Sequence, residues 1–174
     1  MTADEQQRIF DNWLRKHQGV LFKVVRAYAS SSAERDDLFQ EIALQVWRSV
    51  PRYRGDAAVT TWLYRVALFA ALTWVRKERR HYDGRESLDH ITPLLANTDA
   101  PTDPRLDWLY EQIGRLHPVD RSLVVLYLEG FSYKEVAGML GITESNVGVK
   151  LSRIKKRLAQ QVDQHVREEI NYGS

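Results

Sequence analysis

The sequence has no cysteine, and this absence removes several kinds of chemistry at once. None of its 174 residues is Cys, so a disulfide framework, a thiolate nucleophile and a Cys-ligated metal site are all excluded. The five histidines are scattered and lack the H-E-x-x-H spacing of a zinc enzyme. Neither a G-x-x-x-x-G-K-[ST] phosphate loop nor a G-x-S-x-G nucleophile elbow is present. We therefore expect no metal, no cofactor and no catalytic residue, and we do not expect an enzyme.

Long apolar runs are also missing. The longest extends only from Val66 to Leu72, whereas a membrane-spanning helix needs about 20 apolar residues. The first ten residues, MTADEQQRIF, lack the basic-then-apolar pattern of a secretion signal. The sequence therefore predicts a protein without membrane insertion and with a cytoplasmic location.

The net charge of the whole chain is small, but some of its segments carry a clear excess of one sign. The 25 basic and 23 acidic residues leave a net charge of only +2, which at first argues against a nucleic-acid partner. Residues 61–82, however, carry five basic residues and one acid, while residues 83–112 carry two basic residues and seven acids. Residues 145–160 hold five basic residues and no acid. Two basic stretches are thus masked by one acidic stretch, although such blocks are often only solvated helix faces.

The apolar spacing predicts an all-α fold with two small helical domains. Residues 8–80 show helical periodicity, with breaks at the three serines 30–32, at Pro51 and in the glycine-bearing stretch 53–60. We expect Thr60 or Thr61 to cap the third helix. Residues 81–104 are rich in proline and acids and predict a flexible linker. The expected domains are 1–80 and 105–165, followed by a C-terminal tail at 166–174.

The strongest motif lies in residues 131–158. Ser132 and Glu135 have the spacing of a capping box that opens a helix. Gly141 is placed to end that helix in a left-handed conformation, and Thr143 is placed to cap the next one. This pattern predicts a helix-turn-helix, whose second helix enters the major groove of DNA. We expect two short helices here. The candidate DNA-binding residues are Thr143, Ser145, Asn146, Gly148, Lys150, Arg153 and Lys156.

The whole chain resembles a bacterial RNA polymerase sigma factor of the sigma-70 family, in its short extracytoplasmic-function (ECF) group. The stretch DDLFQE at 36–41, followed by Val46 and Trp47, resembles the D-L-x-Q-E motif of region 2.2. The stretches YRGD at 53–56 and TWLYR at 61–65 resemble the segment that leads into regions 2.3 and 2.4. Residues 116–158 resemble region 4. These motifs cover roughly residues 10–80 and 105–160.

The resemblance implies partners and residue roles that the pattern alone does not supply. It implies binding to the clamp coiled coil and the flap of core RNA polymerase, to promoter DNA at the −35 and −10 elements with melting of the −10 element, and to an anti-sigma factor. The implied polymerase contacts are Asp37, Leu38, Gln40, Glu41 and Trp47. The implied −10 contacts are Tyr53, Arg54, Gly55, Asp56, Arg76, Lys77, Arg79 and Arg80. The acidic linker would thread between the two DNA-binding halves.

Four residues depart from the family pattern, and one rival function stays open. The third helix has Leu68, Phe69 and Thr73 where relatives often carry polar DNA contacts, and Gly148 replaces a basic residue. Trp62, Tyr64, Phe69 and Trp74 are candidate platforms for base stacking, although aromatics at this spacing more often pack in a core. The rival function is a stand-alone helix-turn-helix regulator that binds DNA without polymerase.

Overall fold

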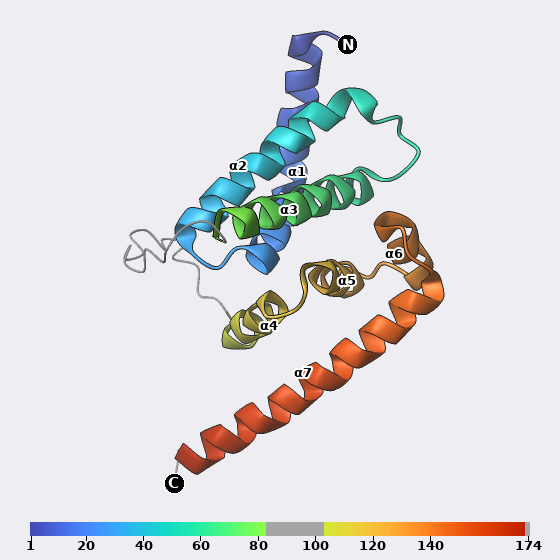
Figure 1. Ribbon diagram of the computed structural model, residues 1–174. Coiled ribbons are helices and arrows are strands. Elements are labelled where there is room, and N and C mark those ends of the chain that lie inside the picture. The colour runs from blue at the N-terminus through green and yellow to red at the C-terminus, as the bar shows by residue number, and fades with distance from the viewer. Residues whose placement is uncertain (83–102, 173–174) are drawn as a thin grey trace. The chain divides into compact units, whose positions relative to one another are not determined.

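The computed structural model describes residues 1–82 and 103–172. Within these ranges the chain contains seven α-helices, one short 3-10 helix and no strand (Figure 1), which confirms the all-α prediction. Nearly all of the expected linker, residues 83–102, lies outside the described part. The helices form two compact units, Met1–Arg121 and Ser122–Ser174. The division falls inside α5 (Pro118–Leu128).

The first unit is built around three long helices, α1 (Ala3–Tyr28), α2 (Ser32–Ser49) and α3 (Val59–Tyr82). Capping boxes open α1 and α2, each with a hydroxyl at the N-cap and a glutamate three residues later. Pro51 lies in the 3-10 turn Val50–Arg52 that follows α2. The three helices pack on one another around Leu21, Val24, Leu38, Ile42, Leu63 and Ala67.

Two expectations for the first unit need correction. Helix α3 begins at Val59, and the Trp62 amide donates to the Ala58 carbonyl at 3.1 Å. Neither Thr60 nor Thr61 therefore caps the helix, because the first turn already includes both. Helix α1 begins at Ala3 rather than near residue 8, because Thr2 and Glu5 form a capping box. Its backbone departs from helical geometry at His17 (φ −131°, ψ 17°), where the helix kinks.

The remainder of the first unit follows the undescribed segment. Helix α4 (Pro104–Gly114) starts at the N-cap Asp103, whose carboxylate accepts from the Arg105 amide at 2.9 Å. This helix packs against α1. Tyr28 at the end of α1 donates its hydroxyl to the Pro118 carbonyl at 2.7 Å.

The second unit contains the predicted helix-turn-helix, formed by α6 (Tyr133–Leu140) and α7 (Glu144–Tyr172). Val136 and Ala137 of α6 and Val147, Leu151 and Ile154 of α7 are buried. These side chains form the apolar interface between the two helices of the motif.

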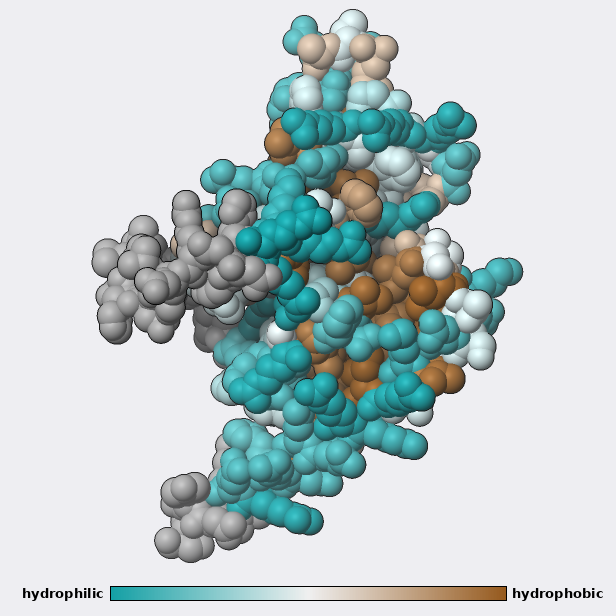
Figure 2. Space-filling model, in the orientation of Figure 1, coloured by the Kyte–Doolittle hydropathy of each residue, from teal (hydrophilic) through white to brown (hydrophobic). Residues whose placement is uncertain are grey.

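The expected shortness of the second helix of this motif is wrong. Helix α7 is 29 residues long and continues to Tyr172. No proline or glycine follows Gly148 before Gly173, so nothing in that stretch breaks the helix. Most residues of α7 from Ala159 to His165 are exposed, and the visible face of this stretch is mainly hydrophilic (Figure 2). Residues 166–172, predicted to be tail, are helical.

Candidate functional site

The loop between η1 and α3 presents a short polar surface. Arg54, Gly55 and Asp56 are exposed, and Gly55 adopts φ +79°, a left-handed conformation that favours glycine. No atom lies within 4 Å of the position that a Cβ on Gly55 would take. The space beside this glycine is therefore open to a ligand.

Tyr53 differs from the three residues that follow it, because its side chain turns inward. Its ring lies 5.2 Å from the Trp13 ring in an edge-on arrangement and 5.6 Å from the Trp62 ring. Its hydroxyl donates to the Ala57 carbonyl at 2.6 Å. The structure thus separates Tyr53 from the exposed part of the predicted −10 site.

The outer face of α3 carries one large exposed aromatic side chain. Phe69 is 72% exposed, whereas the neighbouring Leu68 is 2% exposed and belongs to the core. Of the other candidate stacking residues, Tyr64 and Trp74 are buried and Trp62 is half-buried. Only Phe69 of these four therefore offers its ring to solvent. Thr73, one turn further on, donates its hydroxyl to the Phe69 carbonyl at 2.9 Å.

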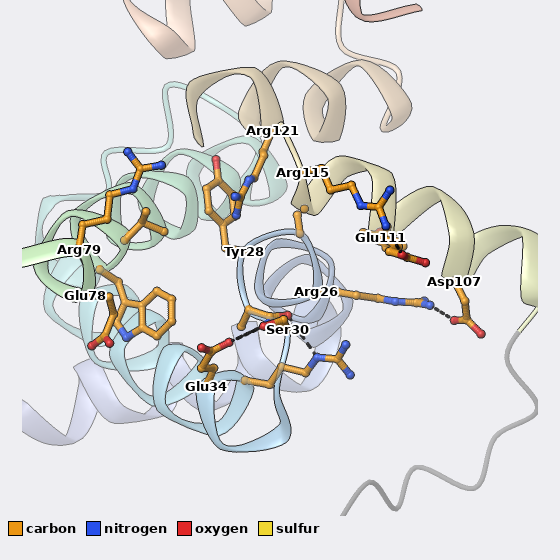
Figure 3. A pocket seen from close by; sticks show the side chains of 17 residues that line it. Arg26, Tyr28, Ser30, Glu34, Glu78, Arg79, Asp107, Glu111, Arg115 and Arg121 are labelled. Atoms are coloured by element: carbon orange, nitrogen blue, oxygen red, sulfur yellow. Dashed lines mark hydrogen bonds and ion pairs between the residues drawn. The ribbon is translucent and has the colours of Figure 1, made fainter. Parts of the chain in front are cut away.

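The four basic side chains predicted at the end of α3, Arg76, Lys77, Arg79 and Arg80, are all exposed. Arg79 also lines a cavity of about 630 Å³ within the first unit (Figure 3). The structure therefore brings all four basic side chains to solvent and places one of them at the edge of this cavity.

The cavity wall carries both signs of charge in nearly equal number. Five arginines line it together with four carboxylates, and Figure 3 shows Arg26 directed at Asp107 and Arg115 at Glu111. The carboxylate of Glu34 accepts hydrogen bonds from Ser30 and Ser31. Its pKa is lowered because these bonds together outweigh the effect of burial, which acts in the opposite direction. A cavity balanced in this way does not form a strong anion site.

Arg121 also lines the cavity. Burial lowers the pKa of its guanidinium, and the charge of Arg79 adds to that effect against the influence of Tyr28. The guanidinium lies over the Tyr28 ring at 5.5 Å, and its Nε donates to the Leu116 carbonyl at 2.9 Å. These contacts hold Arg121 against the end of α1.

The predicted polymerase contacts all lie on α2, but they differ in how far they are exposed to solvent. Gln40 is exposed, and Glu41 is half-buried and accepts from Gln45 at 2.9 Å. Leu38 is fully buried, so it stabilises the core instead of offering a contact surface. Asp37 is exposed but accepts a hydrogen bond from the indole of Trp74 at 2.9 Å, which ties α2 to α3. Trp47, half-buried, donates its indole N–H to Gln7 at 3.1 Å.

The turn of the helix-turn-helix has the predicted geometry. Ser132 and Glu135 form a full capping box, and Gly141 adopts φ 69°. The amides of Gly141 and Ile142 both donate to the Ala137 carbonyl, at 2.9 and 3.2 Å, which is the pattern of a left-handed helix end. The hydroxyl of Thr143 accepts from the Asn146 amide at 3.1 Å and so caps α7. Hydrogen bonds from Ser132 lower the pKa of Glu135, so its carboxylate is charged at neutral pH.

The predicted reading face of α7 is mostly exposed. Ser145, Asn146, Arg153 and Lys156 are exposed, and Lys150 is half-buried. Gly148 is half-buried because the ring of Tyr133 lies beside it, 3.5 Å from the position of an added Cβ. Lys155, the residue before Lys156, lies over the Tyr127 ring at 4.1 Å, and the hydrogen bond to Tyr127 raises the pKa of Lys155.

Sequence reasoning missed several side chains that shape these surfaces. It placed Trp13 only among the apolar residues of the first helix and missed its contact with Tyr53; Trp13 is 5% exposed. It also missed the stacked pair of Phe22 on α1 and Phe39 on α2, whose ring centroids are 5.1 Å apart. Each contact joins residues from different elements of the fold. Apolar periodicity marks such residues as core or surface, but it does not pair them.

The described residues offer neither a metal centre nor a membrane span. In 1–82 and 103–172, no group of three or more His, Cys, Asp and Glu side chains is placed to hold a metal ion. No helix in the same ranges is long and apolar enough to cross a bilayer.

Comparison with known proteins gives matches to both halves of the chain. The family model of Sigma-70 region 2 matches residues 13–81, and that of Sigma-70 region 4 matches residues 106–158. The ECF RNA polymerase sigma factor SigM of Mycobacterium tuberculosis is 30% identical over 152 residues, which cover 87% of this chain and 76% of SigM. The RNA polymerase sigma factor CarQ of Myxococcus xanthus is 32% identical over 164 residues, covering 90% of this chain and 91% of CarQ.

A solved structure has the same fold. A chain in the co-crystal structure of the sigma factor RpoE with the anti-sigma factor NepR from Bartonella quintana matches with a TM-score of 0.71. The match covers 90% of this chain and 98% of that chain, at 18% identity. At this identity the likeness concerns the fold alone.

Proposed function

Because the chain belongs to the sigma-70 family, as an ECF sigma factor, we propose that its two halves divide promoter recognition between them. ECF sigma factors bind core RNA polymerase and direct it to promoters. The observation that carries the proposal for this chain is the complete helix-turn-helix of α6 and α7, with its capping box, left-handed Gly141 and exposed polar face. The domain limits follow the motifs: residues 1–80 form region 2 and residues 105–165 form region 4.

The second half reads the −35 element with the first turns of α7. Asn146 is exposed there and its amide side chain has the donor and acceptor that match adenine. Arg153 and Lys156, about two and three turns further along, are placed to bind phosphates or guanine. Ser145, Thr143 and Lys150 complete this surface. The ring of Tyr133 beside Gly148 closes part of the face to a long side chain.

The first half captures the −10 element. The exposed loop residues Arg54, Gly55 and Asp56 hold a base that has left the stack, which is accessible on edges hidden in the duplex. The exposed Arg76, Lys77, Arg79 and Arg80 bind the backbone phosphates beside it. Phe69 supplies a stacking surface on the same helix, since its ring is 72% exposed.

The polymerase-binding surface lies on α2 and is formed by Gln40, Glu41 and Asp37, with the buried Leu38 supporting it from beneath. The protein carries no catalytic activity of its own and acts in the cytoplasm. An anti-sigma factor holds it inactive, as suggested by the structural neighbour that is bound to NepR.

Run-off transcription tests this function directly. Purified core polymerase is combined with the chain over a library of promoters with randomised −10 and −35 elements. We expect transcripts only when the chain is present, with selection of both elements. Core polymerase that gives the same transcripts with and without the chain would refute the function.

A further inference from the structure

Tyr53 is held by two tryptophans that come from different helices. Trp13 lies on α1, forty residues earlier, and is 5% exposed. Trp62 lies in the first turn of α3. The tyrosine ring makes an edge-on contact with the first, at 5.2 Å and 90°, and a tilted contact with the second, at 5.6 Å. Such arrangements are favourable between aromatic rings. The ring is therefore fixed on two sides before any DNA binds.

The second tryptophan is fixed in turn by the end of α2. The Trp62 indole donates to the Ser49 hydroxyl at 3.0 Å, and that hydroxyl donates to the Val46 carbonyl at 2.8 Å. Ser49 is 8% exposed. A buried polar group that is satisfied on both sides resists displacement. The aromatic bracket of Trp13, Tyr53 and Trp62 is thus anchored on α1, α2 and α3 together.

The tyrosine hydroxyl spans the loop. It donates to the Ala57 carbonyl at 2.6 Å, four residues later in the chain. This bond closes the segment that contains the exposed Arg54, Gly55 and Asp56. The side chain that the sequence assigned to DNA contact therefore faces the protein, while the three residues between its two attachment points face solvent.

We propose that Tyr53 is a positioning residue that holds the 54–56 loop in its binding conformation, and that it does not itself contact the captured base. The proposal rests on the −10 capture proposed above. Ordering a flexible loop on binding costs conformational entropy, so a loop closed in advance binds with less loss. Trp13 supports the same loop conformation through its contact with Tyr53, although it lies outside the loop, on α1.

Trypsin gives a direct test, because Arg54 itself is a cleavage site inside the loop. Tyr53→Phe keeps the ring between the tryptophans and removes only the hydroxyl that reaches Ala57. Proteolysis follows the population of locally opened states. Loss of one hydrogen bond should therefore raise the rate of cleavage after Arg54 by about five-fold. Other sites should be cut at the wild-type rate. Tyr133→Phe, a change of the same kind in the second unit, should leave cleavage after Arg54 unchanged.

Promoter opening by the reconstituted holoenzyme forms the second arm. Tyr53→Phe should slow opening several-fold, and the loss should be smaller in a background that already carries Arg54→Gln, because both changes act through one loop. An unchanged cleavage rate after Arg54 would overturn the proposal, and so would losses in promoter opening that simply add. If Arg54→Gln alone leaves opening intact, −10 capture by this loop fails, while the trypsin result still decides whether Tyr53 holds the loop.

Discussion

At the scale of single residues, Phe69 is the clearest departure from what folding alone requires. It is 72% exposed on a helix whose opposite face fills the core. A single exposed apolar side chain is common on protein surfaces, but this one lies on the helix assigned to promoter melting, where the family pattern often has polar residues. An aromatic ring can stack on any unpaired base without reading its edges. We therefore propose that Phe69 supplies base stacking in place of the polar contacts that this sequence lacks.

Phe69→Ala should impair promoter opening without unfolding the protein. Stacking of one base on an aromatic ring contributes roughly 1–3 kcal/mol, so we expect a loss of at least about five-fold in the rate of open-complex formation. The free energy of unfolding should change by less than about 0.5 kcal/mol, because the side chain is exposed. Permanganate reactivity of unpaired thymines measures the opening. Phe69→Trp serves as the control and should retain activity; equal opening by the alanine and tryptophan variants would contradict the stacking role.

Two glycines of the helix-turn-helix should respond to alanine in opposite directions. Gly148 has helical backbone, and its added Cβ would meet Tyr133 at 3.5 Å, an ordinary contact distance. Gly148→Ala should therefore stabilise the protein by about 0.5–1 kcal/mol. Gly141 has φ +69°, so Gly141→Ala should destabilise it by about 1 kcal/mol or more. Urea unfolding of both variants measures this; a loss of stability in Gly148→Ala would mean that Tyr133 cannot accommodate the methyl group.

At the scale of elements, local signals predicted the start and end of α6 and the start of α7. The Ser132 and Glu135 box, the left-handed Gly141 and the Thr143 cap all have the expected geometry. Each of these depends on residues within four positions of one another, so the sequence contains the whole cause. The start of α3 was missed, and there the contacts come from further away. Trp62 in its first turn donates to Ser49 at the end of α2, a contact that forms only after α2 and α3 have packed.

The same distinction explains which site residues were predicted well. The polar face of the helix-turn-helix follows from helical spacing, and Ser145, Asn146, Arg153 and Lys156 are exposed as expected. Tyr53 belongs to a motif that is readable in the sequence, yet its ring packs against Trp13 and Trp62 and does not face solvent. A sequence motif gives the type of side chain, whereas its direction depends on neighbours from other helices.

The capping box of α6 should make stability depend on pH in a defined direction. Hydrogen bonds from Ser132 lower the pKa of Glu135 below its ordinary value of 4.5. A carboxylate whose pKa falls on folding stabilises the folded state above its unfolded pKa, and this contribution is lost as the pH drops through the folded pKa. Wild type should therefore be more stable than Glu135→Gln at pH 7, and the difference should shrink below about pH 4.5, the ordinary value.

Urea unfolding at pH 7 and pH 3.5 measures this difference. Ser132→Ala is the matched variant, because it removes the hydroxyl that accepts from the Glu135 amide and bonds to the Glu135 carboxylate. This change should lower the free energy of unfolding by about 1 kcal/mol. In the Ser132→Ala background, Glu135→Gln should have a smaller effect at pH 7. A difference between wild type and Glu135→Gln that grows on acidification would show that the charge of Glu135 destabilises the folded state.

At the scale of the whole molecule, the small net charge of +2 conceals two basic stretches, which we propose bind DNA, and one acidic stretch. Nonspecific DNA binding depends on the number of phosphates that basic side chains neutralise. The seven acids within residues 83–112 oppose that attraction in the isolated chain. A sigma factor gains from this arrangement, because DNA binding that waits for polymerase avoids loss of the protein to random sites.

The isolated chain should therefore bind promoter DNA weakly, whereas the holoenzyme should bind it tightly. The salt dependence of the holoenzyme's affinity for DNA should report the region 4 contacts. Arg153 and Lys156 are exposed on α7, and each phosphate contact contributes about 0.9 to the slope of log affinity against log salt. Arg153→Gln and Lys156→Gln should each lower the slope of the holoenzyme by about 1, while Arg167→Gln, on the same helix beyond the DNA-binding turns, should leave it unchanged. Gel shifts across a salt series give both results. Tight binding of a palindromic site by the chain alone would instead favour the stand-alone regulator, because that function requires no polymerase to assemble the two recognition surfaces on DNA.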